Sequence, residues 1–409
     1  MDDDELLVEQ PAWPGSQLRV AVVTETYPPE INGVAMTIGR MVDGLQERGH
    51  HVQLVRPQQR GADRPVASAS CEQVLRPGVP LPRYAGLRMG LPAARTLFKL
   101  WMQRRPDVVH VVTEGPLGWS AVAAARKLRL ALTSDFHTNF HSYSTHYGMG
   151  WLKKPISGYL RKFHNRTNLT LVPTASLQRE LTYQGYHNVQ VVARGVDTGL
   201  FNPGRRSPVL RAAWGLAPDQ LAVIYVGRIA PEKNMPLVLK AFEAIRQARP
   251  DARLVLVGDG PSRPGLQSSL SDTIFAGMHT GAALAEHYAS GDLFLFPSLT
   301  ETFGNVTLEA MASGLPVVAF DYAAAGDLIR DADDGVKVPL REETRFIEAA
   351  AGLAEDDGRR QVLGARARAI ALNHDWRHVN DAFVVALRQS IQRHQRVQDA
   401  HTKFLVALD

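Results

Sequence analysis

Two glutamates eight positions apart, Glu301 and Glu309, stand out as carboxylates that the local sequence can bring together. They follow a short apolar run, Leu293–Phe296, that is typical of a buried strand, and a helix with apolar residues at helical spacing begins near Val306. A turn at Phe303–Gly304 would bring both carboxylates to one pocket. We therefore read this stretch as strand, polar loop and helix.

The chemistry open to such a pocket follows from its parts. The first turn of a helix offers backbone N–H groups and the positive end of the helix dipole, which suit a phosphate or diphosphate. Carboxylates accept hydrogen bonds from sugar or ribose hydroxyls. The segment thus suits a nucleotide sugar, and the competing interpretation is a capped surface helix with two solvated acids.

A second polar segment, Gly227–Asn234 (GRIAPEKN), follows the predicted strand Leu221–Val226 in the same half of the chain. Arg228 can bind a diphosphate through a bidentate fork, and Lys233 can bind it as a point charge. Both segments follow strands, so they lie at the same carboxyl edge of the predicted sheet. Together with Glu301 and Glu309 they make a site with two cations for a diphosphate and two acids for hydroxyls.

A histidine in the first half, His137, follows the predicted strand Leu130–Ser134, at the edge where open α/β sheets bind ligands. We expect it to hydrogen-bond a ligand or to handle a proton, with a buried structural histidine as the alternative. His141 and His146 follow, and the spacing of His137 and His141 would suit one helix face. The segment has no HExxH pattern and no obvious third ligand, so we expect no metal site.

The first predicted strand, Leu18–Thr24, leads into a loop that contains Gly33 and then a helix from about Met36 to Arg48. The loop lacks the GxGxxG fingerprint, and the next strand ends in Arg56 where a nicotinamide enzyme would place an acid. The sequence therefore lacks the main features of a nicotinamide-dependent enzyme that transfers hydride. Gly33 would let a ligand approach the backbone closely. We expect residues 58–82, rich in Pro, Gly, Ala and Ser, to form an irregular surface excursion.

The succession of strands and helices predicts an α/β protein with two Rossmann-like domains. A length of 409 residues fits two domains of ordinary size. We expect a flexible leader at 1–17, an N-terminal acceptor-binding domain at 18–205, a C-terminal nucleotide-sugar-binding domain at 206–375, and C-terminal helices at 376–409 that pack back across the domains.

Composition excludes several classes of protein. Hydrophobic residues make up 45% and charged residues 21%, which are ordinary globular values, and we expect no membrane-spanning segment. The one cysteine, Cys71, leaves no disulfide framework and favours a reducing cytoplasm.

The net charge of +5 is uneven, because residues 1–200 carry 23 Lys and Arg against 16 Asp and Glu. Much of the excess lies in two runs that mix basic with aromatic and aliphatic residues, 83–105 and 151–166. Such helices can lie on an anionic bilayer, although they could equally pack on a sheet with solvated outer faces. No nucleic-acid motif accompanies the charge. The candidate membrane or acceptor contacts are Lys153, Lys154, Arg161 and Lys162.

At this point the motifs, in this order, resemble those of the retaining glycosyltransferases of family 4, which have the GT-B fold of two facing Rossmann-like domains. The resemblance rests on the Glu-x7-Glu motif from Glu301 to Glu309, supported by GRIAPEKN and by GVDTGLFNP from Gly195. More narrowly, three segments resemble those of bacterial glycolipid α-mannosyltransferases that use GDP-mannose: TETYPPEINGVA, TEGPLG and FHTNF. They are also similar to sulfoquinovosyl and glucosyl diacylglycerol synthases.

The resemblance implies a role for each matched position. It implies that Arg228 and Lys233 bind the donor diphosphate, that Glu301 contacts the donor sugar, and that Glu309 contacts the ribose. His137 would touch the sugar near the reacting carbon, and Gly33 would keep the N-terminal loop close to the diphosphate. The backbone that would help to hold the phosphates and sugar belongs to Phe303, Gly304, Asn305 and Val306.

The resemblance also implies a mechanism and shows one departure. The acceptor would attack on the face that the leaving group departs, and a donor phosphate oxygen would take its proton, without a metal or another cofactor. Many members have two glycines before the acid that follows the last strand, whereas this chain reads Tyr322-Ala-Ala-Ala-Gly-Asp327.

The partners expected are a nucleotide sugar donor, GDP-mannose first and a UDP-hexose as the alternative, a lipid-linked or saccharide acceptor, and an anionic membrane surface at the inner face. No nucleic acid is expected. A nucleotide-sugar epimerase or hydrolase on the same fold is a further alternative, and donor turnover without acceptor would favour it. A non-catalytic sensor of nucleotide sugars is less compatible with the full set of two cations and two acids.

Overall fold

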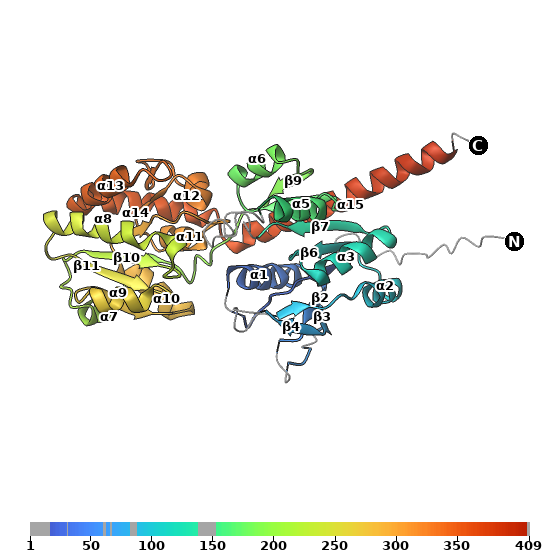
Figure 1. Cartoon of the computed structure of the whole chain (residues 1–409), viewed down its shortest axis with the longest axis horizontal. Helices are drawn as coiled ribbons and strands as arrows, with labels where there is room; N and C mark the ends of the chain where they lie inside the picture. The colour runs from blue at the N-terminus through green and yellow to red at the C-terminus, as the bar shows by residue number, and fades with distance from the viewer. Residues whose placement is uncertain are drawn as a thin grey trace. The chain divides into compact units, whose positions relative to one another are not determined.

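Two large β-sheets with helices around them carry the described part of the chain in the computed structural model (Figure 1). The structure describes residues 17–30, 32–59, 63–65, 68–81, 88–137 and 153–406. The α/β architecture agrees with the predicted alternation of buried strands and helices.

The first sheet has seven strands in the order β3-β2-β1-β6-β7-β8-β9. The pairs β1–β2, β1–β6, β2–β3 and β6–β7 are parallel. The middle strands β6, β7 and β8 are buried along their whole length, as parallel strands covered on both faces should be. The strands are β1 Arg19–Val23, β2 His51–Pro57, β3 Cys71–Arg76, β6 Val108–Val111, β7 Ala131–Asp135, β8 Leu169–Val172 and β9 Val189–Val191.

The expectation of an irregular excursion over residues 58–82 was wrong for its second part. Strand β3 pairs in parallel with β2, so residues 71–76 form the edge of the sheet. Two short strands, β4 (Gly78–Pro80) and β5 (Arg88–Gly90), then pair with each other in antiparallel fashion. An edge strand is only partly buried, and its mixed polar sequence therefore hid it among loop residues.

The start of the first helix differs from its predicted position. Helix α1 begins at Gly33, three residues before the predicted start, because the side chain of Asn32 accepts a hydrogen bond from the backbone N–H of Ala35 at 2.9 Å. Gly33 is thus the first residue of a helix. The helices are α1 Gly33–Glu47, α2 Ala94–Gln103, α3 Pro116–Lys127, α5 Lys153–His164 and α6 Ala175–Tyr183.

The second sheet has six strands in the order β12-β11-β10-β13-β14-β15, and all neighbouring pairs are parallel. Helices α8 and α13 lie on one face of this sheet, and α9 and α10 lie on the other (Figure 1). The strands are β10 Ala222–Val226, β11 Arg253–Val257, β12 Ile274–Gly277, β13 Leu293–Phe296, β14 Val317–Phe320 and β15 Val336–Val338. The helices are α7 Pro208–Ala213, α8 Met235–Ala248, α9 Arg263–Ser269, α10 Gly281–Ser290, α11 Asn305–Ala312, α12 Ala323–Leu328, α13 Glu343–Glu355 and α14 Asp357–Leu372.

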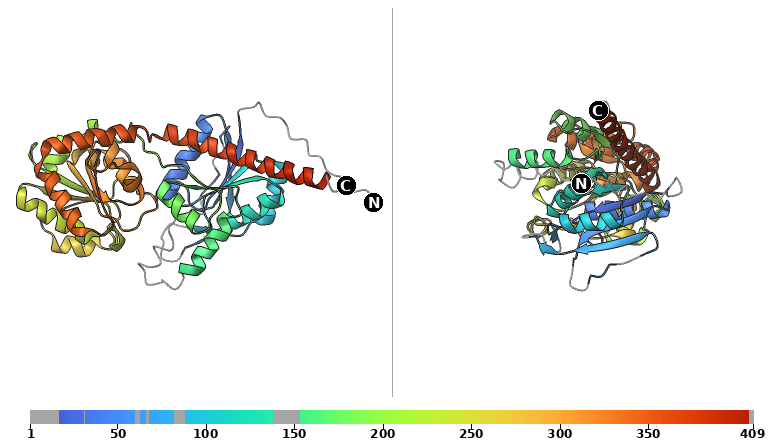
Figure 2. Two further views of the ribbon diagram at one scale, coloured as in Figure 1. Left: turned by 90° about the horizontal axis from the view of Figure 1, so that it is seen from above. Right: turned by 90° about the vertical axis from the view of Figure 1, so that its right-hand side faces the viewer.

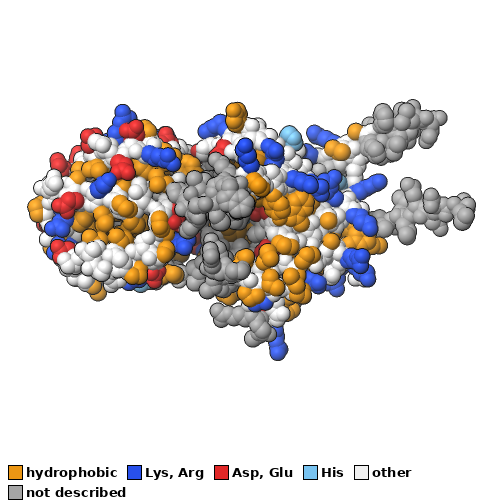
Figure 3. Space-filling view, viewed as in Figure 1, with side chains coloured by type: hydrophobic (Ala, Val, Ile, Leu, Met, Phe, Trp, Pro, Cys, Tyr) orange, Lys and Arg blue, Asp and Glu red, His pale blue; other side chains and the backbone are white. Residues whose placement is uncertain are grey.

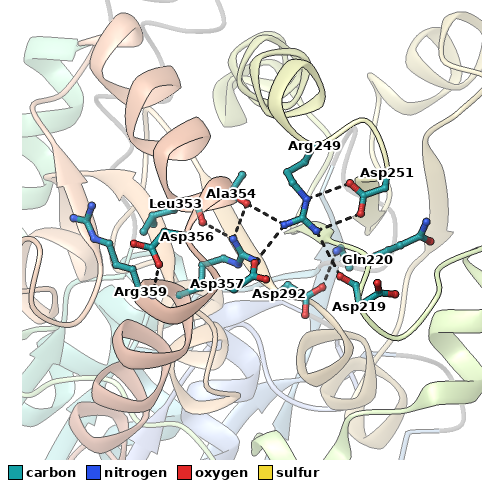
Figure 4. Close-up of polar contacts among 12 residues, drawn as sticks. Asp219, Gln220, Arg249, Asp251, Asp292, Leu353, Ala354, Asp356, Asp357 and Arg359 are labelled. Atoms are coloured by element: carbon teal, nitrogen blue, oxygen red, sulfur yellow. Dashed lines mark hydrogen bonds and ion pairs between the residues drawn. The ribbon is translucent and has the colours of Figure 1, made fainter.

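An ionic network around Arg249 lies at the end of the second sheet where β10 and β11 begin (Figure 4). The Arg249 guanidinium contacts Asp251 at 3.1 Å and Asp357, at the start of α14, at 3.3 Å. Hydrogen bonding to Asp251 raises the pKa of Arg249, and the same contact lowers the pKa of Asp251. This network therefore holds the strand starts and the α13–α14 turn together at the edge opposite the carboxyl ends of the strands.

The described chain ends in one long helix, α15 (Trp376–Val406), which Figure 2 shows as a continuous rod. By density of contacts the chain forms two compact units, one of residues 1–135, 163–170 and 384–409, and the other of 136–162 and 171–383. Helix α15 therefore contributes its first turns to one unit and its remainder to the other. In the first unit, Ser390 Oγ lies 3.5 Å from the carbonyl oxygen of Leu132.

Surface composition differs between the two halves, each taken by itself. On the face drawn in Figure 3, Lys and Arg side chains lie among hydrophobic ones over the N-terminal half, and Asp and Glu are more frequent over the C-terminal half. Within the described residues, none of the helices has both the length and the apolar sequence that a membrane crossing requires.

Candidate active site

The loop and helix that carry the paired glutamates are held in place by the chain that follows strand β14. Gly304 caps the start of α11 with a φ of 91°, in the left-handed region that favours glycine. The Tyr322 hydroxyl donates to the carbonyl oxygen of Glu301 at 2.9 Å, and the backbone N–H of Ala324 donates to the carbonyl of Phe303 at 2.8 Å. The loop is therefore fixed at two points by this segment, which presents the first N–H groups of α11 in a defined direction.

Glu301 contacts Lys233, the last residue of a short 3-10 turn (Pro231–Lys233) that follows β10. The Lys233 Nζ donates to Glu301 Oε1 and lies 5.8 Å from the ring centre of Phe296. Their side chains are only 12% and 16% exposed, so the pair is largely shielded from water. The structure thus brings together one predicted cation and one predicted acid.

Arg228 lies between β10 and that 3-10 turn and has a more open side chain. Its guanidinium is 50% exposed and stands 3.6 Å from the carboxylate of Glu232, which is only 2% exposed. The carbonyl of Glu232 also accepts the backbone N–H of Leu299 at 3.1 Å, which ties this turn to the loop before α11. Glu232 was not predicted as a site residue, and its carboxylate lies beside the guanidinium of Arg228.

Glu309 has a partner of its own on helix α10. The fully buried Tyr288 donates its hydroxyl to Glu309 Oε2 at 2.8 Å. Burial raises the pKa of Glu309 to about 7, and the Tyr288 hydrogen bond opposes that rise. A carboxyl with a pKa near neutrality changes charge in the physiological range. The two glutamates therefore lie in different environments, since Glu301 pairs with the cation of Lys233 and Glu309 with the hydroxyl of Tyr288.

His137 lies two residues beyond strand β7, at the carboxyl end of the first sheet as predicted. Its Nδ1 is 2.8 Å from the guanidinium of Arg194, a residue that lies three positions beyond β9 and is 4% exposed. Sequence reasoning missed Arg194, because only the tertiary fold brings the ends of β7 and β9 together. His141 and His146 lie outside the described residues, and within those residues no group of three potential metal ligands is found.

Gly33 offers open space at the start of α1. No described atom would lie within 4 Å of a Cβ added there, and its φ is not in the left-handed region. The protein's own packing therefore does not require glycine at this position. A requirement for glycine would have to come from a ligand.

A partly buried carboxylate, that of Glu25, follows strand β1 and lies at the start of helix α3. The backbone N–H of Leu117, in the first turn of α3, donates to Glu25 Oε1 at 3.0 Å. Burial raises the pKa of Glu25 to about 7, opposed by this backbone hydrogen bond. A Cβ at Gly115 would lie 2.0 Å from Glu25 Oε2, so the carboxylate fills the space at this helix end.

A chain of buried polar groups, Ser134, His164 and Glu114, has the order of a catalytic triad. Ser134 Oγ lies 2.9 Å from His164 Nδ1, and His164 Nε2 lies 3.2 Å from Glu114 Oε1. Ser134 and His164 are 0% exposed, which denies a substrate access to the hydroxyl. The chain is therefore a structural network under the carboxyl edge of the first sheet.

Helix α5 carries the candidate membrane contacts. Lys154 and Lys162 are exposed, together with Tyr159, which is 45% exposed. Arg161 is also exposed, but its guanidinium donates to the carbonyl oxygen of Gln184 at 3.0 Å, at the end of α6. Arg161 thus has a structural role, and the side chain of Lys153 lies outside the described residues.

Comparison with known proteins identifies the family. Residues 31–200 match the model described as Glycosyltransferase Family 4, and residues 220–356 match the model described as Glycosyl transferases group 1. The chain is 35% identical over 373 residues to a GDP-mannose-dependent alpha-mannosyltransferase of Mycobacterium tuberculosis, covering 90% of this chain and 95% of that protein. It is 29% identical to a sulfoquinovosyl transferase of Arabidopsis thaliana, covering 92% of this chain and 75% of that protein.

Solved structures agree on the fold. A sucrose-phosphate synthase from Thermosynechococcus elongatus superposes with a TM-score of 0.74 at 19% sequence identity, over 91% of this chain and 98% of that chain. Three observations support one assignment: the parallel sheets, the paired motifs at the carboxyl edge of the second sheet, and the match to relatives over nine-tenths of the chain. The protein belongs to glycosyltransferase family 4 and is a hexosyltransferase with the GT-B fold.

Proposed function

We propose that the protein transfers mannose from GDP-mannose to a lipid-linked or saccharide acceptor, with retention of configuration at the anomeric carbon. The observation that carries the proposal is the meeting of Lys233 and Glu301 beside the start of α11. A cation next to an open helix N-terminus can hold a diphosphate, and the carboxylate beside it can hold hydroxyls of the sugar. The choice of mannose and guanine is supported by relatives named GDP-mannose-dependent alpha-mannosyltransferase, which are 31% to 35% identical over nine-tenths of the chain.

In this proposal Arg228 and Lys233 bind the diphosphate and stabilise the charge that develops on the leaving nucleotide. The backbone of Phe303, Gly304, Asn305 and Val306 helps to hold the phosphates and the sugar. Gly33 allows the start of α1 to approach the diphosphate. The exposed guanidinium of Arg228 is suited to meet a ligand, because its side chain is half open to solvent.

The carboxylates and the histidine orient the sugar nucleotide. Glu301 contacts hydroxyls of the donor sugar, and Glu309 accepts hydrogen bonds from the ribose. His137 contacts the sugar near the reacting carbon. The glycosidic bond to the diphosphate breaks as the acceptor oxygen bonds to the same face of the anomeric carbon, and the acceptor proton passes to a phosphate oxygen of the departing nucleotide.

A UDP-hexose-dependent synthase of glycosyl diacylglycerol is the second candidate. The similarity to a sulfoquinovosyl transferase over most of the chain favours keeping it, although the identity is 29% against 35% for the mannosyltransferase. Both candidates use the same diphosphate contacts. They differ in the base and in the sugar hydroxyls, which are the groups that a binding experiment can separate.

The first test is a thermal-shift titration against GDP, UDP, ADP and their mannose and glucose conjugates. A ligand at 100 times its dissociation constant adds about 2.7 kcal/mol to the free energy of unfolding. GDP and GDP-mannose should give the largest shift, and Lys233→Met should abolish it. Lys240→Met, which removes an exposed lysine paired with Glu343 in the same half, is the matched control and should keep it.

The outcomes separate the candidates. A preference for UDP and UDP-glucose would move the function to the diacylglycerol branch. Shifts that are equal for all nucleotides, or absent, would overturn the donor site. Turnover of GDP-mannose at an undiminished rate without any acceptor would point to a hydrolase or an epimerase.

We also infer that the protein works at the cytoplasmic face of a membrane and touches anionic lipid through α5. Lys154, Tyr159 and Lys162 are exposed on this helix, and an amphipathic helix with basic and aromatic residues can lie on a charged bilayer. The acceptor would then be reached at the lipid surface.

Sedimentation with vesicles that contain phosphatidylglycerol tests this contact. Lys154→Gln with Lys162→Gln should reduce the bound fraction severalfold, since each basic residue near the surface contributes about 1 kcal/mol. Lys240→Gln with Arg366→Gln makes the same change in net charge on exposed side chains elsewhere and should bind as the wild type. Equal loss in both double variants would show that net charge, and not α5, carries the attraction.

A further inference from the structure

The contact between Arg194 and His137 joins two segments that leave the first sheet at the same end. His137 follows β7, and Arg194 follows β9, with β8 as the strand between them. The distance from the guanidinium to His137 Nδ1 is 2.8 Å, which is a hydrogen bond. Both residues belong to the same compact unit, so the contact is a local feature of the fold.

The chemistry of the two groups fixes which atom donates. A guanidinium carries only N–H donors and stays protonated in proteins. His137 Nδ1 must therefore accept, which means that it carries no proton. A neutral imidazole has one N–H, and that proton consequently lies on Nε2.

The backbone around both residues is held firmly. The backbone N–H of Phe136 donates to the carbonyl of Leu171 at 2.9 Å, directly before His137. On the other side, the backbone N–H of Val196 donates to the carbonyl of His374 at 2.9 Å. A Cβ at Gly195 would lie 2.7 Å from the Trp376 ring, so glycine is needed for this close approach. On the N-terminal side of Arg194, the backbone N–H of Val192 donates to the carbonyl of Val172 at 2.9 Å, so the backbone is fixed on both sides of Arg194.

We propose that Arg194 is a positioning residue that holds His137 as a neutral imidazole with its proton on Nε2, so that His137 serves the reaction as a hydrogen-bond donor and not as a base. The inference deepens the proposed function and rests on it for the part that concerns the sugar. With Nδ1 occupied by the guanidinium and Nε2 protonated, neither nitrogen is available to accept a proton from the acceptor. His137 can instead donate from Nε2 to an oxygen of the donor sugar.

This assignment agrees with the cost of burying a cation. Arg194 is 4% exposed, and a buried guanidinium persists only where hydrogen bonds and neighbouring groups compensate for lost hydration. The histidine nitrogen is one such acceptor. Because Arg194 is buried, its side chain keeps the hydrogen bond to His137, which a mobile arginine at the surface would not maintain.

The direct test is the proton position itself, read from nitrogen-15 NMR of the full chain with labelled histidine. The His137 signal is identified by its loss in His137→Gln. At pH 7.5 the ring should be neutral with the proton on Nε2. A proton on Nδ1, or a doubly protonated ring, would overturn the proposal without recourse to any variant of Arg194.

Two substitutions then test the cause. Arg194→Met should release the ring into a mixture of tautomers, whereas Arg194→Lys, which keeps a cationic donor, should retain the Nε2–H form. If Arg194→Met folds and leaves the tautomer unchanged, the proposal fails. Should the buried Arg194→Met not fold, Arg194→Lys and the wild-type spectrum still decide the matter.

Kinetics show whether the contact matters for transfer. Arg194→Met should lower kcat by about 10- to 100-fold, as loss of a group that orients a functional histidine does elsewhere, with a smaller change in KM. In a His137→Gln background it should have little further effect, because Arg194 acts through the histidine. Independent, multiplying losses would overturn the proposal. Arg366→Met, which removes an exposed arginine paired with Asp333, is the control and should leave kcat unchanged.

The two failures can be told apart. If the wild-type protein binds no nucleotide and transfers no sugar, the proposed function fails, yet the NMR experiment still reports the tautomer of His137. If transfer is normal and the tautomer differs from the expected one, only the role of Arg194 fails.

Discussion

Helices α3 and α11 both begin after a strand of a parallel sheet, yet their first turns are treated in opposite ways. At α3 a side chain of the protein occupies the helix end, because Glu25 Oε1 accepts a hydrogen bond from the backbone N–H of Leu117. At α11 no side chain of the described residues caps the helix, and Gly304 forms the N-cap through its backbone conformation alone. Lys233 and Arg228 stand on the neighbouring strand-to-helix turn.

The difference favours the second sheet as the one that would bind the phosphates of the proposed donor. A helix N-terminus binds an anion when its N–H groups and dipole face an open space. At α3 that space is filled by a side chain, and a Cβ on Gly115 would already clash with it. Near α11, Lys233 contacts Glu301, four residues before the helix begins. A side chain of the protein therefore occupies the start of α3, whereas no described side chain caps the start of α11.

The largest expected effect comes from removing a cation beside α11. Lys233→Met should lower kcat/KM for the donor by at least about 100-fold, because it removes charge stabilisation of the leaving diphosphate. Steady-state kinetics with Lys240→Met as the control will measure it. Normal activity in Lys233→Met would mean that the contact with Glu301 is structural. The start of α11 would then not be a phosphate site that depends on Lys233, and the comparison with α3 would not bear on donor binding.

A middle-sized effect is expected from Tyr288→Phe. The Glu309 pKa is raised to about 7 by burial, so donor affinity should rise as the pH rises through about 7 and the carboxyl becomes an acceptor. The Tyr288 hydrogen bond opposes the rise in the Glu309 pKa, so its loss should move that midpoint to higher pH. At pH 7 it should weaken binding by up to about tenfold.

Titration of GDP affinity between pH 6 and 8.5 measures this midpoint. Tyr183→Phe is the matched control, since that tyrosine is 92% exposed. A profile that keeps its midpoint in Tyr288→Phe would show that ionisation of Glu309 does not govern donor binding.

A smaller effect is expected at the other helix. The Glu25 pKa, about 7 in the folded protein against 4.5 as its ordinary value, is raised, so the folded state holds the proton more tightly. The resulting stability is present below about pH 4.5 and is lost as the pH rises through about 7. Glu25→Gln keeps an oxygen for the Leu117 N–H and removes the ionisation. Its Tm relative to wild type should therefore rise between pH 5 and pH 8, by about 2–4 °C for each kcal/mol.

Thermal unfolding at several pH values, without nucleotide, will show this. Glu348→Gln, at an exposed position on α13, should show no such trend. A parallel pH dependence in wild type and Glu25→Gln would remove the buried carboxylate from α3 as a source of stability.

The smallest effect concerns Ala323, in the segment where many family members have two glycines before the acid. Ala323 has a φ of 52°, in the left-handed region, which costs an alanine about 1–2 kcal/mol. Ala323→Gly should therefore raise the free energy of unfolding by up to about 1 kcal/mol, after the entropy of the unfolded chain is subtracted. Ala324→Gly, one residue further into α12, should instead lower it by about 1 kcal/mol. Equal losses in a denaturant titration would contradict the backbone conformation at Ala323.

Much of the fold was predictable because buried parallel strands have continuous apolar sequences. The run Leu293–Phe296 is strand β13 with the predicted bounds, and β10 lies within the predicted run Leu221–Val226. The edge strand β3 escaped because one of its faces meets solvent and its sequence is mixed. The early start of α1 escaped because its capping residue, Asn32, precedes a glycine, which argues against a helix when taken alone.

The site residues were predictable as types and positions, but their partners were not. The placement of Lys233 and Glu301 at one edge followed from each coming after a strand, and the structure adds that they touch. The roles assigned to them remain predictions. Tyr288 and Arg194 could not be found from spacing, because each meets its partner through tertiary contacts, 21 and 57 residues away along the chain.

Helix α15 has a consequence for the order in which the protein is made. Its residues beyond 384 belong to the compact unit that starts with strand β1, and His394 contacts the carbonyl oxygen of Arg129 at 3.0 Å, 265 residues earlier. On the ribosome, where domains usually fold from the N-terminus onward, this unit cannot complete its packing until that part of α15 has been translated. The compact unit that contains the first residues to be synthesised is therefore among the last parts of the protein to complete its folding.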